Sequence, residues 1–126
     1  MTKLLLDTHA AVWWLGDRSK LADEAHEAIA DVDNDVYVSA ASIWEIEVKR
    51  AAGRLKTPNP MAEAAQATGL LELPVTWRHA ERAAHLPPHH TDPFDRMLVA
   101  QAQLEGFTIV TRDKHVSRYQ VAVLPA

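Results

Sequence analysis

Short apolar runs alternate along this chain with stretches in which apolar residues recur every three or four positions. The runs predict buried strands, and the recurring positions predict helices that pack against them. The expected strands span residues 3–6, 36–38, 70–75, 107–110 and 121–124. The expected helices span residues 8–15, 21–30, 61–67 and 76–86, and two more end near residues 52 and 105. Strands that alternate with helices are typical of an α/β fold, so we expect a central five-stranded parallel sheet flanked by helices on both faces.

The helix that ends near Ala52 carries both an apolar stripe and a carboxylate. Ser39 or Ser42 caps its start, and Gly53 follows its end. Apolar residues at helical spacing predict a core-facing side made of Ala41, Trp44, Val48 and Ala51. Glu45 lies among apolar neighbours, where little of the helix surface is left to face water.

Four carboxylates stand where the predicted strands and helices meet. Asp7 directly follows the first strand, and Asp113 lies three residues beyond the fourth. Asp95 lies in the first turn of the helix before that fourth strand, and Glu45 lies about one turn into the helix after the second. Parallel sheets bind ligands beyond the carboxyl ends of their strands. The four acids therefore meet at one rim if the first and fourth strands are neighbours.

Carboxylates gathered at one rim predict a bound cation, because they repel one another and resist desolvation. Mg²⁺ and Mn²⁺ prefer oxygen ligands and bind through a few carboxylates together with water and substrate phosphate. Such a site suits hydrolysis of a phosphodiester by metal-activated water. The pattern thus predicts divalent-metal chemistry on a phosphate ester.

Each of these acids, taken alone, also has a purely structural interpretation. Asp7 and Asp113 can cap the helical turns that follow them. Glu45 can pair with Lys49 one helical turn later. The coincidence of four such acids at one predicted rim favours a shared site over four separate structural roles.

Two further acids share the start of the helix that ends near residue 105. Asp92 has the position of an N-cap, with Pro93 as the first helical residue. Asp95 follows three residues later and projects toward the same end of the helix. We expect Asp95 to be the metal ligand and Asp92 to act as the cap or as a supporting partner.

Composition and charge narrow the class of protein. At 126 residues the chain is expected to form one domain, residues 1–126. No apolar run approaches the roughly 18 residues of a membrane span, and Asp7 interrupts the first run too early for a signal peptide. Cysteine is absent, which fits a reducing compartment. We therefore expect a cytoplasmic protein with no membrane partner.

The net charge of −4 argues at first against a nucleic-acid partner. When the five acids of the predicted rim are set aside, 12 acidic residues remain against 13 basic ones. The surface outside the site is then balanced, so a nucleic-acid partner is not excluded.

Histidine and tryptophan suggest two further features. His85, His89 and His90 flank two prolines, and we interpret this segment as a rigid loop with exposed imidazoles in preference to a zinc site. The four tryptophans are expected to lie mostly in the core. Trp13 and Trp14 are adjacent on one helix and cannot share one interior, so one of them is expected to meet another chain, in a homodimer or a partner protein.

Four segments in order cover nearly the full length of the chain. They are Leu4-Leu5-Leu6-Asp7-Thr8-His9, Ser39-Ala40-Ala41-Ser42-Ile43-Trp44-Glu45-Ile46, His90-Thr91-Asp92-Pro93-Phe94-Asp95-Arg96-Met97-Leu98-Val99-Ala100-Gln101-Ala102 and Thr111-Arg112-Asp113. At these segments the chain resembles the PIN-domain ribonucleases, specifically the VapC toxins of bacterial toxin–antitoxin pairs. The resemblance implies a single PIN-like domain, an endoribonuclease that cuts RNA with Mg²⁺ or Mn²⁺, and a VapB-type antitoxin that blocks the site.

By motif position, the same resemblance implies a catalytic and metal-binding site made of Asp7, Glu45, Asp95 and Asp113. Asp7 and Asp95 are the expected metal ligands, and Glu45 is either a ligand or a base that acts through water. Asp113 is expected either to hold a second metal or to contact the metal ligands without binding the metal itself. Thr111 is expected to orient a carboxylate or a water molecule by hydrogen bonding.

Other proteins also place acids at the edge of a parallel sheet. A phospho-acceptor signalling module needs an Asp after a central strand, whereas here Val38 is followed by Ser39. A phosphatase with an aspartyl nucleophile needs a second Asp two residues after the first, where this chain has His9. The phospho-acceptor module and a catalytically silent binding domain of similar fold stay open as alternatives.

Overall fold

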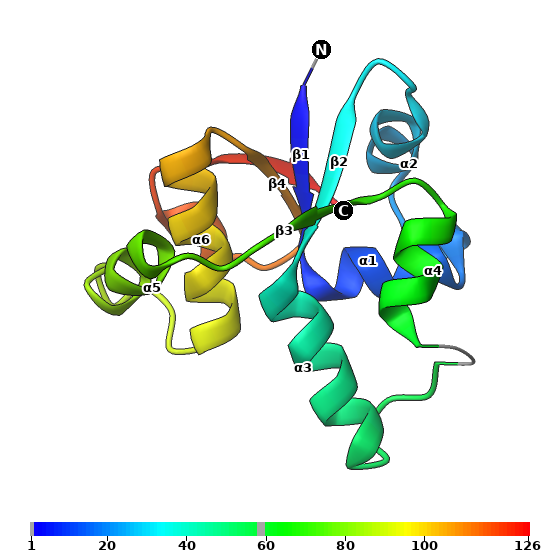
Figure 1. Ribbon diagram of the computed structural model, residues 1–126. Coiled ribbons are helices and arrows are strands. Elements are labelled where there is room, and N and C mark those ends of the chain that lie inside the picture. Colours follow the sequence, from blue (N-terminus) through cyan, green and yellow to red (C-terminus); the bar gives the residue numbers. More distant parts are fainter. Residues whose placement is uncertain (1, 58–59) are drawn as a thin grey trace.

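Five short apolar segments form one parallel sheet in a computed structural model that describes residues 2–57 and 60–126 (Figure 1). The strands are β1 (Lys3–Leu6), β2 (Asp35–Ser39), β3 (Leu71–Leu73), β4 (Thr108–Thr111) and β5 (Ala122–Pro125). Their order across the sheet is β3-β2-β1-β4-β5, and every neighbouring pair is parallel. Leu5 in the central strand is paired with Tyr37 on one side and with Ile109 on the other. The predicted five-stranded parallel sheet is confirmed, as is the adjacency of the first and fourth strands.

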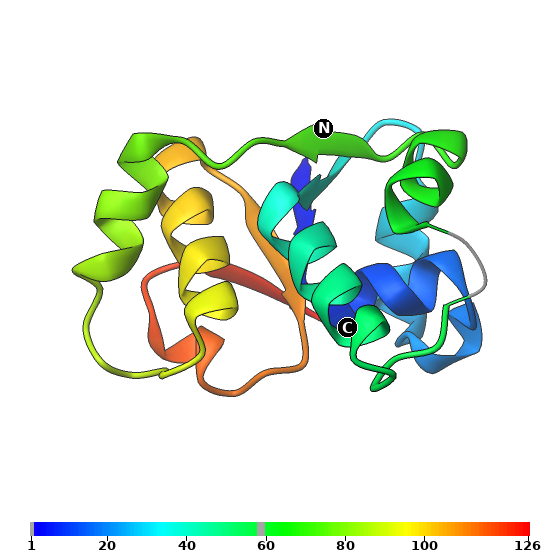
Figure 2. The same ribbon diagram turned by 60° about the horizontal axis from the view of Figure 1, so that its bottom comes forward.

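Helices cover both faces of the sheet, as predicted. They are α1 (Thr8–Leu15), α2 (Asp23–Ala30), α3 (Ala40–Ala51), α4 (Met61–Ala67), α5 (Trp77–Ala84) and α6 (Pro93–Glu105), with 3₁₀ turns at Arg18–Lys20 and Val116–Arg118. Figures 1 and 2 show α1, α2 and α4 on one side and α5 and α6 on the other, with α3 extending between them beyond the ends of the strands. Among the described residues, no helix is long and apolar enough to cross a membrane.

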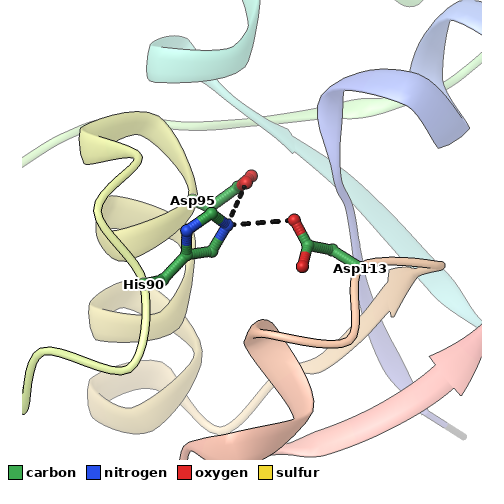
Figure 3. Close-up of side chains that lie close together, drawn as sticks. All are labelled: His90, Asp95 and Asp113. Carbon is green, nitrogen blue, oxygen red and sulfur yellow. Dashed lines mark hydrogen bonds and ion pairs between the residues drawn. The ribbon is translucent and has the colours of Figure 1, made fainter.

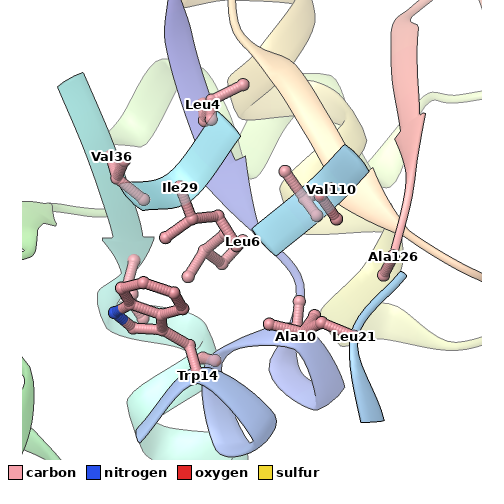
Figure 4. Close-up of a cluster of buried hydrophobic side chains, with 12 residues drawn as sticks. Leu4, Leu6, Ala10, Trp14, Leu21, Ile29, Val36, Val110 and Ala126 are labelled. Atoms are coloured by element: carbon pink, nitrogen blue, oxygen red, sulfur yellow. The ribbon is translucent and has the colours of Figure 1, made fainter. Parts of the chain in front are cut away.

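Alternate residues of the central strand supply the two cores. Leu6 packs with Trp14 of α1 and Ile29 of α2 on one face (Figure 4). Leu5 points the other way and packs with Leu98 of α6. Burying one such leucine contributes about 2 kcal/mol to folding. A strand buried on both faces is apolar at successive positions, which explains the unbroken leucine run before Asp7.

Most predicted boundaries agree with the structure to within two residues. The first strand and the helices at residues 8–15 and 61–67 have the expected bounds. The second helix begins at Asp23, because a 3₁₀ turn precedes it. The third strand ends at Leu73, before Pro74, whose ring nitrogen has no hydrogen to donate to a ladder.

The predicted core-facing side of α3 is wrong, and the exposure of Trp44 shows this most clearly. Trp44 is 64% exposed and Val48 is 43% exposed, whereas Ser42, Glu45 and Ile46 are buried with Ala41. The helix turns a partly polar side inward because that side faces the ends of the strands and not a flat apolar sheet. The expectation that tryptophans lie mostly in the core also fails for Trp77, which is 89% exposed.

Candidate active site

A cleft lined by acids lies where the chain leaves β1 and β4. The acids in its lining are Asp7, Glu45, Asp92, Asp95 and Asp113. Other side chains in the lining are Thr8, His9, Trp13, Lys49, His90 and Arg112. The structure therefore brings all four predicted site acids, together with the expected supporting acid, into one cleft. Their chemical roles stay predictions.

Asp7 serves a helix and the cleft at the same time. Its backbone N–H donates to the carbonyl of Val110 at 3.1 Å, which fixes it beside the end of β4. One carboxylate oxygen caps α1 by accepting the N–H of Ala10 at 2.8 Å, and the other accepts the hydroxyl of Thr111 at 2.6 Å. Burial raises the pKa of Asp7 above its ordinary value, although both hydrogen bonds act in the opposite direction. The capping role and a role in the site are compatible in one side chain.

Glu45 reaches the cleft from the buried side of α3. It is only 5% exposed, and its Oε1 accepts the hydroxyl of Thr8 at 2.5 Å. The ammonium of Lys49 lies 2.6 Å from Oε2, as the spacing of the two residues predicts. Lys49 also lines the cleft, so this ion pair belongs to the site as well as to the helix.

Asp92 and Asp95 both lie at the start of α6 but make different contacts there. Asp92 Oδ1 accepts the backbone N–H groups of Phe94 at 2.8 Å and Asp95 at 3.2 Å, the geometry of an N-cap. Burial, together with the neighbouring carboxylates of Asp92 and Asp7, raises the pKa of Asp95 to about 7. Asp95 is thus held in the cleft at a position where its negative charge is disfavoured in the metal-free protein.

Asp113 follows β4 in a tight turn. Its backbone N–H donates to Thr111 Oγ1 at 3.0 Å, and its Oδ1 accepts the backbone N–H of His115 at 2.7 Å. Partial burial alone would raise the pKa of Asp113, but the hydrogen bonds from His115 and His90 lower it below its ordinary value. The hydroxyl of Thr111 therefore links Asp7 to Asp113, and its orienting role stays a prediction.

His90 is a member of the cleft that the sequence did not assign. Its Nε2 lies 2.9 Å from Asp95 Oδ2 and 2.9 Å from Asp113 Oδ2, and Figure 3 shows the imidazole between the two carboxylates. Its nearness to the acidic motif was visible in the sequence, since it precedes Asp92 by two residues. Its contact with Asp113 was not visible, because that contact depends on the path of the loop.

Arg96 fixes that loop and was also missed. Its guanidinium donates to the carbonyls of Ala83 at 2.9 Å, Leu86 at 3.0 Å, Pro87 at 3.1 Å and His90 at 3.2 Å. A planar group with five donors suits a loop that presents several carbonyls to one point. Arg96 therefore attaches the α5–α6 connection to α6 and so determines where His90 lies.

The donor atoms of the cleft fit a divalent cation. Carboxylate oxygens of Asp95 and Asp113 lie within 4.8 Å of one another and of a ring nitrogen of His90. The raised pKa values of Asp7 and Asp95 indicate carboxylates whose charge the protein does not fully compensate, and a cation would compensate it. The three loop histidines do not come together, because His85 contacts a carbonyl of its own helix and His89 packs on Tyr119. The expectation of exposed imidazoles is wrong for His90, whose side chain is 12% exposed and lies in the cleft.

Comparison with known proteins agrees with this geometry. The family model of the PIN domain matches residues 4–122. Ribonuclease VapC22 of Mycobacterium tuberculosis is 30% identical in an alignment of 123 positions that covers 95% of this chain and 94% of that protein.

Solved structures share the fold at low sequence identity. VapBC2 of Rickettsia felis, bound to a promoter DNA fragment, has a TM-score of 0.73 at 13% identity, with 98% of both chains covered. DNA-bound VapBC of Salmonella typhimurium has a TM-score of 0.71 at 16% identity, again with 98% of both chains covered. VapBC-5 of Mycobacterium tuberculosis has a TM-score of 0.62 at 20% identity, covering 98% of this chain and 97% of that one.

Proposed function

This chain belongs to the PIN-domain family, and from that premise we propose that it is a Mg²⁺- or Mn²⁺-dependent endoribonuclease and the toxin of a toxin–antitoxin pair. The observation that carries the proposal is the meeting of Asp7, Glu45, Asp95 and Asp113 in one cleft. These acids come from four segments that are distant in the sequence. A purely structural role for each acid would not require them to share one cleft.

Asp7 and Asp95 are the residues we assign to the cation, with Asp113 beside them. The two Asp side chains are held by α1 and α6, whose starts lie next to the central strands β1 and β4. When bound, the cation neutralises charge on the attacked phosphate and activates water. Hydroxyls of Thr111 and Thr8 fix the orientation of Asp7 and Glu45, so the oxygens keep their places without substrate.

Glu45 and Lys49 have separate roles in this proposal. Water adds to phosphorus while the bond from phosphorus to the leaving ribose oxygen breaks. Glu45 accepts the proton that the water loses, and the leaving oxygen takes up a proton from solvent to become a hydroxyl group. Lys49, in the same cleft, presents an ammonium group to the phosphate backbone. The cleft thus holds a cationic group that binds the negative substrate and a carboxylate that accepts the proton.

The partner we propose is a VapB-type antitoxin, because several structures of the same fold are named as VapBC or toxin–antitoxin complexes. The exposed indole of Trp44 packs edge-on against Phe94 at 5.4 Å and adds an apolar surface near the cleft that a second chain can cover. We also propose a homodimer, and action in the cytoplasm.

The proposal is tested with purified protein and a mixed-sequence single-stranded RNA. Cleavage is expected with Mn²⁺ or Mg²⁺, to stop when EDTA removes the metal, and to return when Mn²⁺ is restored. Calorimetric titration with Mn²⁺ separates the enzyme from a silent binding domain. A protein that binds neither metal and cuts no RNA would be the silent alternative.

A further inference from the structure

His90 joins two carboxylates that no other described side chain brings together. It lies in the connection between α5 and α6, whereas Asp95 lies in the first turn of α6 and Asp113 follows β4 (Figure 3). Its Nε2 is 2.9 Å from one oxygen of each. Oxygens of the two carboxylates lie within 4.8 Å of one another. Two negative charges this close are unfavourable unless a hydrogen-bond donor or a cation lies between them.

The second ring nitrogen of His90 indicates which atom carries the hydrogen. The backbone N–H of Asp92 donates to Nδ1 of His90 at 3.3 Å, so Nδ1 is an acceptor. The hydrogen of the ring then belongs to Nε2, which donates toward Asp95 and Asp113. A nitrogen that carries a hydrogen has no free lone pair for a metal. The geometry therefore favours a donor at this point of the cleft over a nitrogen ligand.

The backbone of His90 is fixed on both sides of the ring. Its N–H donates to the hydroxyl of Tyr119 at 3.0 Å, and its carbonyl accepts the guanidinium of Arg96 at 3.2 Å. The ring also lies 5.0 Å from the ring of His115. The side chain is 12% exposed, so the imidazole has little freedom to leave the carboxylates.

We propose that His90 is a positioning residue, whose Nε2–H sets the spacing of the Asp95 and Asp113 carboxylates and so preorganises the cation site. This inference rests on the proposed function, because it assigns the two acids to a cation. His90 holds the Oδ2 atom of each acid, and the backbone N–H of His115 holds the Oδ1 atom of Asp113. Residues that orient metal ligands in this way are worth about 10-fold or more in metal affinity.

Three substitutions of His90 distinguish the contribution of Nε2 from that of Nδ1. The amide nitrogen of Gln reaches about as far as Nε2, so His90→Gln keeps a donor between the carboxylates but supplies no nitrogen ligand. The carbonyl oxygen of Asn lies near the place of Nδ1, so His90→Asn keeps the acceptor for Asp92 N–H and loses the bridge. His90→Ala loses both. His89→Gln is the matched control, because His89 packs on Tyr119 and does not contact the carboxylates.

The measurement is the dissociation constant of Mn²⁺ without RNA, by calorimetry, with thermal unfolding in EDTA as the check on folding. We expect His90→Gln and His89→Gln to stay within about 3-fold of the wild type, and His90→Asn and His90→Ala to bind about 10-fold more weakly. Rescue by Gln but not by Asn is a result that a merely structural role would not give.

Three outcomes would overturn the inference. Equal Mn²⁺ affinity in all variants removes the positioning role, and tighter binding by His90→Ala makes His90 a competitor of the cation. Weak Mn²⁺ binding by the Gln, Asn and Ala variants alike, with Mg²⁺ affinity unchanged, makes His90 a nitrogen ligand.

The wild type separates this inference from the proposed function. If the wild type binds Mn²⁺ but cuts no RNA, only the proposed function fails. If it binds no Mn²⁺, both fail.

Discussion

At the scale of single residues, the cleft holds carboxylates in opposite electrostatic conditions. Burial raises the pKa of Asp7, and burial with neighbouring acids raises that of Asp95, whereas hydrogen bonds lower the pKa of Asp113. A group held against its preferred protonation state costs folding free energy. The raised pKa values of Asp7 and Asp95 therefore lower the folding stability of the protein, as is typical of functional clefts.

Substitution of Asp95 by Asn is expected to stabilise the metal-free protein at pH 8. The pKa of Asp95 rises from 3.8 when unfolded to about 7 when folded. Between these values the folded state holds more protons than the unfolded state, so stability falls as the pH rises through this window. Asp95→Asn removes this loss and should add about 2 kcal/mol to the free energy of unfolding in EDTA at pH 8, and almost nothing at pH 4.

The control for that experiment is Asp113→Asn, since the pKa of Asp113 is shifted the other way. A lowered pKa gives stability that is present at neutral pH and lost as the pH falls, so this variant should be less stable than the wild type at pH 8. Urea denaturation at both pH values measures these differences. The interpretation fails if the two variants shift stability in the same direction.

Thr111 should matter through its hydroxyl alone. Thr111→Val keeps the shape but leaves Asp7 Oδ2 and the N–H of Asp113 without their partner, so we expect a loss of about 1–2 kcal/mol in stability and of about 10-fold in RNA cleavage. Thr111→Ser is the control, because it keeps the hydroxyl. Full activity in the Val variant would show that Thr111 does not orient the acids.

At the scale of elements, the periodicity of apolar residues predicted the order and type of the helices and strands. It did not predict correctly which side of every helix is buried. The strand at residues 3–6 and the cap Asp92 were visible, as was the choice between Ser39 and Ser42 as a cap, because caps and apolar runs are local signals. The structure has Ser39 as that cap. The inward side of α3 was predicted wrongly, because helical spacing cannot tell an apolar core from an acid-lined cleft. Contacts made by loops, such as His90 with Asp113, depend on long-range packing and were not predictable.

The connection between α5 and α6 should depend on the shape of the Arg96 side chain as well as on its charge. Arg96→Lys keeps a positive charge but cannot donate to four carbonyls at once, so we expect a loss of about 2 kcal/mol in stability. Amide hydrogen exchange should become faster over residues 85–92, with little change in β1. Arg82→Lys is the comparison, because Arg82 makes an exposed bond to Gln103. Unchanged exchange in the Arg96 variant would refute its role as the anchor.

At the scale of the whole molecule, the sheet order explains why four dispersed acids meet. Placing β1 beside β4 brings Asp7, which follows the first strand, next to the turn that holds Asp113. The net charge of −4 is then a property of the cleft more than of the outer surface. A cation in the cleft reduces that charge, so an acidic protein can still accept RNA.

Metal binding should therefore stabilise the molecule as a whole. Millimolar Mn²⁺ is expected to raise the unfolding temperature of the wild type by a few degrees, through preferential binding to the folded state. The same addition should have a much smaller effect on Asp95→Asn. Differential scanning calorimetry at pH 8 makes the comparison, and an equal rise in both proteins would place the cation elsewhere.

The central claim is that this acid-lined cleft cuts RNA with a divalent metal. Its most direct test measures cleavage of single-stranded RNA with Mn²⁺ by the wild type, Asp7→Asn, Asp95→Asn and the surface control Asp17→Asn, after circular dichroism has shown that each is folded. The account predicts cleavage by the wild type and by the control, and at least about a 100-fold loss in the two cleft variants. Undiminished cleavage by folded Asp7→Asn and Asp95→Asn would contradict it.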